Sequence, residues 1–151
     1  MHGIYSVTGS FSVTAAQTLI QLKAGASSII EIQRAWVTQS DVIADDNMEI
    51  QILRNSTAST VTSFTPSPFE VGDQAAAAVG GVSATGIDAS VEGTPGNILV
   101  REGASVLAGF TWLPVPNEMI YIPPGGFLSL KSAIDITAAT LVCGITFREI
   151  G

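Results

Sequence analysis

Few residues of this chain belong to the types that carry out catalysis. Its 151 residues include one histidine, His2, and one cysteine, Cys143. Metal sites in β-sheet enzymes usually combine two or more imidazoles with a carboxylate, and nucleophilic triads also depend on a well-placed histidine. A single histidine at position 2 meets neither requirement. We therefore expect no catalytic residue, no metal and no cofactor, and the chain is not predicted to be an enzyme.

The densest group of carboxylates is formed by Asp41, Asp45, Asp46 and Glu49. A calcium loop would need an oxygen ligand at the position of Ile43, followed by a glycine, and this segment has neither. A weak cation site and a solvated hairpin tip are both compatible with the cluster. The spacing favours the hairpin tip.

The other residues with chemical potential are interpreted structurally. Cys143 lies in the apolar run 141–145, which is typical of a small buried side chain. The glycines at 80–81 and 125–126 are not accompanied by the Lys and Ser/Thr of a phosphate-binding loop. We interpret them as turn glycines.

The surface is predicted to carry little charge. Charged residues make up 13% of the chain and the net charge is −7, whereas soluble domains average about 25% charged residues. So weakly charged an exterior suggests that much of it faces other protein, and we expect an oligomer. The six Lys and Arg residues are scattered, which argues against nucleic-acid and anionic membrane partners. No apolar run reaches the length of a membrane span, and no secretory signal is visible.

Short alternating segments dominate the chain. Alternation predicts half-buried strands at Ile4–Val13, Thr18–Lys23 and Ser28–Thr38, and the last segment, Ala138–Ile150, is patterned in the same way. Further strands are expected at 48–52, 87–91, 98–101, 105–113, 119–122 and after the Pro123-Pro124-Gly125-Gly126 turn. In that turn Pro124 supplies the first corner, and Gly125 or Gly126 supplies the corner with positive φ. The two strongly patterned ends are expected to pair within sheets.

The stretch from about 55 to 86 is weakly patterned. It contains the stiff segment Phe64–Phe69, with prolines at 66 and 68, and the small-residue run 75–81, where one helical turn is possible. Long loops of this kind are uncommon unless they have a role. This stretch is either an interaction surface or a loop that packs Phe64 and Phe69 over an open end of the fold.

Together these signals predict an all-β protein of eight to ten short strands, in a single domain spanning residues 1–151. The strand spacing favours a sandwich or barrel. The length and the mid-chain excursion favour a jelly-roll β-sandwich with two antiparallel sheets of about four strands each. Trp36 is expected on the buried face with Ile30 and Ile32. For Trp112, capping of the core and contact with a neighbour remain equally open.

The C-terminal half resembles a known family. The segment Phe110-Thr-Trp-Leu-Pro-Val-Pro-Asn-Glu-Met-Ile-Tyr-Ile-Pro-Pro-Gly-Gly-Phe-Leu-Ser-Leu, followed by a last strand ending Ile145-Thr-Phe-Arg-Glu, is similar to small jelly-roll proteins encoded by tailed bacteriophages. These phages use such proteins as capsid cement, or decoration, subunits. The resemblance covers roughly residues 28–149. It implies a homotrimer seated at three-fold or quasi-three-fold positions on the outside of an icosahedral head.

The expected function is therefore structural. The chain would be synthesised in the host cytoplasm, would bind itself and the major capsid protein, and would reside on the outer capsid surface of the virion. The alternative is a receptor- or carbohydrate-binding jelly-roll module of a phage fibre or spike, with Trp112, Tyr121 and the 64–69 segment exposed. The residues expected to contact other proteins are Ile4, Tyr5, Phe64, Pro66, Pro68, Phe69 and Trp112.

Overall fold

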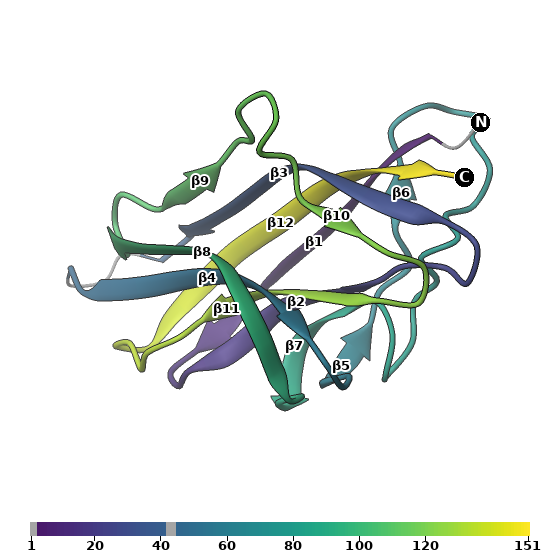
Figure 1. Ribbon diagram of the computed structural model, residues 1–151. Helices are drawn as coiled ribbons and strands as arrows, with labels where there is room; N and C mark the ends of the chain where they lie inside the picture. The colour runs from purple at the N-terminus through teal and green to yellow at the C-terminus, as the bar shows by residue number, and fades with distance from the viewer. Residues whose placement is uncertain (1–2, 42–44) are drawn as a thin grey trace.

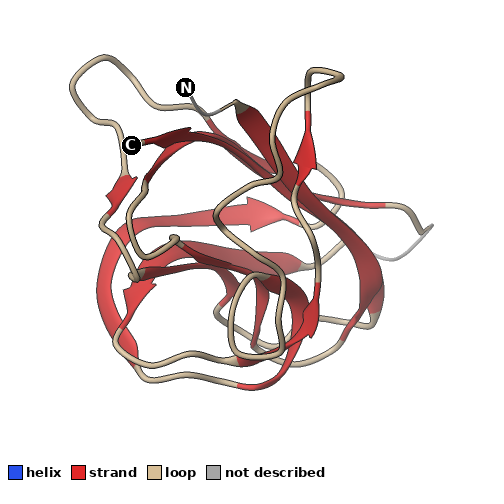
Figure 2. Cartoon of the chain, turned by 90° about the vertical axis from the view of Figure 1, so that its right-hand side faces the viewer, coloured by secondary structure: helices blue, strands red, loops and turns tan. Residues whose placement is uncertain are grey.

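The computed structural model describes residues 3–41 and 45–151, and these contain no helix (Figure 2). They form a sandwich of two antiparallel sheets with six strands each, which confirms the predicted all-β class and corrects the expected four strands per sheet. The strands are β1 (Ile4–Val13), β2 (Gln17–Lys23), β3 (Ile29–Gln39), β4 (Asn47–Asn55), β5 (Thr60–Ser63), β6 (Ser67–Pro68), β7 (Gly86–Val91), β8 (Pro95–Ser105), β9 (Phe110–Trp112), β10 (Tyr121–Ile122), β11 (Phe127–Ser132) and β12 (Ala139–Ile150).

The first sheet, called sheet A, has the order β10-β3-β12-β1-β6, and β9 pairs with β3 on the same edge as β10. The second, sheet B, has the order β5-β7-β2-β11-β4-β8. Figure 1 shows β1, β12 and β3 side by side in one layer. The two terminal strands pair along their length, from Ile4 opposite Arg148 to Val13 opposite Ala139. The prediction that the patterned ends pair is thus confirmed.

The mid-chain stretch accounts for the additional strands. Two short strands, β5 and β6, lie within residues 55–86, and β7 begins at the end of that range. β6 pairs with the edge of sheet A, whereas β5 and β7 extend sheet B. The run 75–78 forms no helical turn. Local pattern could not predict strands this short, because a two-residue strand is defined only by its partner.

Two further boundaries differ from the sequence prediction. Residues 98–101 and 105–113 were expected to form separate strands around Glu102 and Gly103. Instead β8 runs through both residues, pairing with β4, and β9 is a separate three-residue strand. Both residues sit on an exposed edge strand, where turn-type composition does not prevent pairing.

The Pro123–Gly126 turn has the predicted conformation. Gly125 has φ +72°, and Gly126 N–H donates to Pro123 O at 2.9 Å, as in a turn that needs a positive-φ residue at its third position. It connects β10 of sheet A with β11 of sheet B, so the two flanking strands belong to different sheets.

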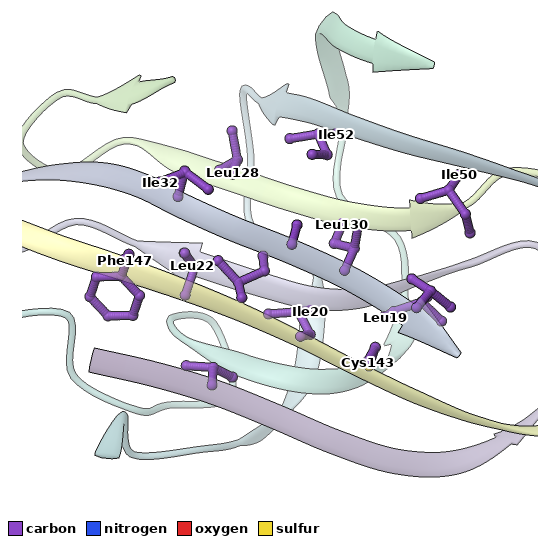
Figure 3. Close-up of a cluster of buried hydrophobic side chains, with 14 of the residues drawn as sticks. Leu19, Ile20, Leu22, Ile32, Ile50, Ile52, Leu128, Leu130, Cys143 and Phe147 are labelled. Atoms are coloured by element: carbon purple, nitrogen blue, oxygen red, sulfur yellow. The ribbon is translucent and has the colours of Figure 1, made fainter. Parts of the chain in front are cut away.

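The core fills the space between the sheets. Figure 3 shows Ile20, Leu22 and Leu128 from sheet B near Ile32, Cys143 and Phe147 from sheet A. All six side chains are fully buried. Among the described residues no helix is long and apolar enough to span a membrane.

Candidate interaction surface

The outer faces of the two sheets differ in how far they are covered. On sheet B, outward polar side chains such as Gln21 and Ser129 are fully buried, because the mid-chain segments pack over them. Gln21 accepts a hydrogen bond from Ser59 N–H at 2.7 Å and donates to Ala84 O at 2.7 Å. On sheet A the outward residues Thr8 and Ser10 remain exposed. The outer face of sheet A is called the open face.

A row of side chains crosses one end of the open face. In strand register, Tyr121 lies opposite Glu31, Glu31 opposite Arg148, and Arg148 opposite Ile4. Phe69 N–H donates to Ile4 O at 2.9 Å, which extends the β1–β6 pairing by one residue and adds Phe69 to the row. Directly opposite residues of an antiparallel pair share a face. The row therefore brings together segments from five parts of the chain.

Glu31 is shielded although it faces outward. Only 4% of it is exposed. Its carboxylate accepts hydrogen bonds from Arg148 Nη2, at 2.9 and 3.1 Å to its two oxygens, and from Gln33. The hydrogen bond from the Tyr121 hydroxyl to Glu31 raises the pKa of Tyr121, and partial desolvation and the negative charge act in the same direction. The Arg148 side chain itself remains half-exposed.

Apolar side chains surround the ion pair, and we call them the apolar rim. They are 38–63% exposed. Ile29 and Ile150 lie opposite each other one row beyond Glu31 and Arg148. The apolar rim consists of Ile4, Ile29, Phe69, Tyr121 and Ile150. Exposed apolar side chains gathered in one place are a feature of protein-interaction surfaces.

Trp36 also lies on the open face, which corrects its predicted position in the core. Thr146 lies opposite Arg34, but Phe147 lies opposite Ile32, so Gln33 is an extra residue in β3. This bulge reverses the alternation, and the Trp36 indole packs over Gly144, where an added Cβ would lie 2.1 Å from the ring. The Arg34 guanidinium lies 4.7 Å from the indole centroid.

The predicted contact residues have different positions. Ile4 and Phe69 are brought together in the apolar rim, and Pro68 is exposed beside them. Phe64 and Trp112 are half-buried and pack against the core. Of the two roles considered for each of them, covering the core agrees with this position.

Two predicted contact residues are buried and cannot touch a partner in this conformation. Tyr5 is fully buried, its ring 5.7 Å from that of Phe147, and its hydroxyl donates to Gln74 O at 2.9 Å. Pro66 is buried as well. Tyr5 alternates with outward-facing Ile4 and Ser6 along β1, and this alternation already indicates that it faces inward.

The loop between β6 and β7, called the mid-chain loop, is fixed to one end of the sandwich, near the start of β1 and the end of β12 (Figure 1). Glu149 points inward from β12, and its carboxylate accepts hydrogen bonds from Ala77 N–H at 2.9 Å and Ala78 N–H at 2.8 Å. Beside this loop lies a hollow of about 420 Å³, lined mainly by small side chains together with Lys23.

The acidic cluster is engaged locally. Asp46 accepts hydrogen bonds from Thr137 N–H and Asn47 N–H, which lower the pKa of its carboxyl. Asp41 accepts one from Thr140 N–H at 2.9 Å, and Asp45 accepts one from the Ser105 hydroxyl. Within residues 3–41 and 45–151, no three His, Cys, Asp or Glu side chains are grouped to hold a metal ion. His2 and Ile43 lie outside the described residues.

Sequence reasoning missed Ile29, Ile150, Arg148 and Glu31. Alternation already placed Ile29 and Ile150 at outward positions, because Ile30 and Phe147 were predicted to face inward or lie on the apolar face of their strands. Comparison with known proteins identifies no relative, since no family model, curated protein or solved structure matches this chain.

Proposed function

We propose that this protein is a capsid decoration subunit, a homotrimer that binds the major capsid protein on the outside of an icosahedral phage head and bridges neighbouring capsomers. The observation that carries the proposal is the open face with its apolar rim around the shielded Glu31–Arg148 pair. A sheet face of this composition suits a protein whose role is to hold other proteins together.

The strand order supports the jelly-roll part of the proposal. The first strand pairs with the last, β2 with β11, β3 with β9 and β10, and β4 with β8. This nesting is what results when one long antiparallel hairpin is folded over into two sheets, as in a jelly roll. The short strands β5 and β6, together with β7, then form an addition at the sheet edges.

A trimer would make the attachment strong without large individual contacts. After one subunit binds, the other two are held at high effective concentration near their sites. Subunits that bind only the intact head stabilise it by mass action, by RT ln(1 + [L]/Kd) per site. The rigid β core would let this binding energy resist separation of the capsomers.

The direct test uses phage heads stripped of this protein. Adding the purified protein should give co-sedimentation with the heads and raise their melting temperature. Phe69→Ser, which changes the apolar rim, should weaken both effects. Val91→Ser is the matched control, because Val91 is similarly exposed but lies in sheet B. If the wild-type protein neither sediments with the heads nor stabilises them, the decoration role is wrong.

A carbohydrate-binding role is the second candidate, and the exposed Tyr121 ring favours it. The half-exposed Arg148 lies near the ring and offers hydrogen-bond donors next to an aromatic surface. Tyr121 replaces the half-buried Trp112 as the residue to test. A glycan array comparing wild type with Tyr121→Ala decides this: a glycan signal lost in the variant supports the role, whereas no signal, or an unchanged one, counts against it.

A further inference from the structure

A second exposed apolar feature projects beside the open face. The loop between β9 and β10 stands out from the sandwich at the β3 edge of sheet A (Figure 1). Its residues Leu113 and Val115 are 63% and 52% exposed. We call residues 113–118 the prong.

The prong is held in one shape by its own sequence. Glu118 N–H donates to Val115 O at 3.0 Å, and Asn117 has φ +72°. With Pro116 at the preceding corner, these features define a tight turn. Pro114 restricts the backbone further. A segment already ordered in this way loses little conformational entropy on binding.

The charges of the open face and of the prong are complementary. The chain has 13 acidic and 6 basic residues, yet the outward strand positions of sheet A, among the described residues, carry Arg34, Arg148 and a single acid, Glu31. Glu31 is already bound by Arg148. The outward positions of the open face therefore carry one more positive than negative charge in an acidic protein, and Arg34 is available to an acidic partner. The prong ends in the exposed carboxylate of Glu118.

We propose that the prong of one copy docks on the open face of the next. Leu113 and Val115 pack against the apolar rim, and Glu118 approaches Arg34 and Arg148. The prong and the open face are different surfaces, so the contact is heterologous and closes into a ring when the rotation permits. This inference rests on the homotrimer in the proposed function and specifies which surfaces form it. The apolar rim then joins neighbouring copies, so Phe69→Ser weakens binding to phage heads because it weakens the trimer.

Two variants of the full chain test the interface by sedimentation equilibrium over a concentration series. The wild type should reach three times the chain mass of 15.6 kDa. A prong variant, Leu113→Asp with Val115→Asp, and a rim variant, Phe69→Asp, should each self-associate at least about tenfold more weakly. All three side chains are exposed, and circular dichroism checks that the variants fold. Val91→Asp is the control and should assemble like the wild type.

Mixing the variants tests the head-to-tail geometry. The rim variant keeps its prong and the prong variant keeps its open face, so the mixture should form a one-to-one dimer through one intact contact and should not close a ring. Glu118→Lys provides a second measurement: it should weaken association at low salt, and less so as salt screens the charges.

Three results would overturn the inference: a monomeric wild type, variants that assemble normally, or a mixture that associates no better than its components. Because the assay contains no capsid, it fails independently of the decoration role. A ring-forming protein that does not bind heads refutes only that role, whereas a monomer that binds heads refutes this interface and the trimer but leaves the decoration role standing.

Discussion

Replacing Glu149 by glutamine should release the mid-chain loop. Glu149 is 2% exposed, and its carboxylate receives the N–H groups of Ala77 and Ala78. The isosteric amide keeps one acceptor oxygen but turns an NH₂ group toward the second N–H. One charge-assisted hydrogen bond is thereby lost, and a backbone donor is left without an acceptor at a buried position.

The expected cost follows from these two contacts. A hydrogen bond to a charged group contributes about 1.5–3 kcal/mol, and an unsatisfied buried donor costs about 1–3 kcal/mol. Because these terms overlap, we expect Glu149→Gln to lower the free energy of unfolding by about 2–4 kcal/mol. For a chain of this size, each kcal/mol shifts Tm by about 2–4 °C, so Tm should fall by roughly 5–15 °C.

Urea unfolding at fixed protein concentration measures the loss, because association contributes to apparent stability. Native-state cleavage by a glutamate-specific protease at exposed Glu70 measures opening of the loop itself. Glu102→Gln, on the exposed strand β8, is the control and should change stability by less than about 0.5 kcal/mol. If Glu149→Gln unfolds within that same margin and is cleaved no faster than wild type, the carboxylate does not hold the loop.

Three other predictions concern the core and the open face. The pKa of Tyr121 is raised above its ordinary value of 10.0 by its hydrogen bond to Glu31, so ultraviolet titration should find it ionising at higher pH than in Glu31→Gln; equal titration curves would contradict this. Burial raises the pKa of Cys143 to about 12, so thiol reagents at pH 8 should modify it only after denaturation, and rapid reaction of the folded protein would show that the thiol is accessible. Gly144→Ala should displace the Trp36 indole and cost about 1–3 kcal/mol, with a change in tryptophan fluorescence; an unchanged spectrum and stability would contradict the packing.

The sequence predicted the fold well where alternation continued without interruption. Ile4–Val13 was predicted with its exact observed bounds, and the last strand was predicted within one residue at its start. Both strands keep one apolar face for ten or more residues, so their pairing buries a continuous stripe. The Pro123–Gly126 turn was predictable for a different reason, because only glycine adopts the φ of Gly125 at little cost.

Trp36 shows where alternation fails. The pattern from Ile30 to Ile32 placed Trp36 inside, and the bulge at Gln33 moved it outside. A glycine would have marked a possible bulge, but a glutamine gives no such signal. The extra residue is recognisable only from the pairing of β3 with β12, a contact between residues more than a hundred positions apart.

The candidate site was predicted only in part, for a related reason. Ile4 and Phe69 were each expected to contact a partner, but their adjacency depends on β6, a strand of two residues that exists through its pairing with β1. Ile29 and Ile150 were not recognisable as contact residues, because an isolated exposed apolar residue is common on protein surfaces. Only the register that aligns them around Arg148 turns these separate residues into one surface.

The asymmetry between the two sheets indicates why the chain devotes so many residues to its middle segment. Those residues cover the outer face of sheet B, where Gln21 is satisfied by Ser59 and Ala84. The same segment also supplies Phe69 to the apolar rim of sheet A. The middle segment therefore buries part of one face and enlarges the apolar rim on the other. A ring built through the open face would give its copies one common orientation, which they need if they are to bind one shell together.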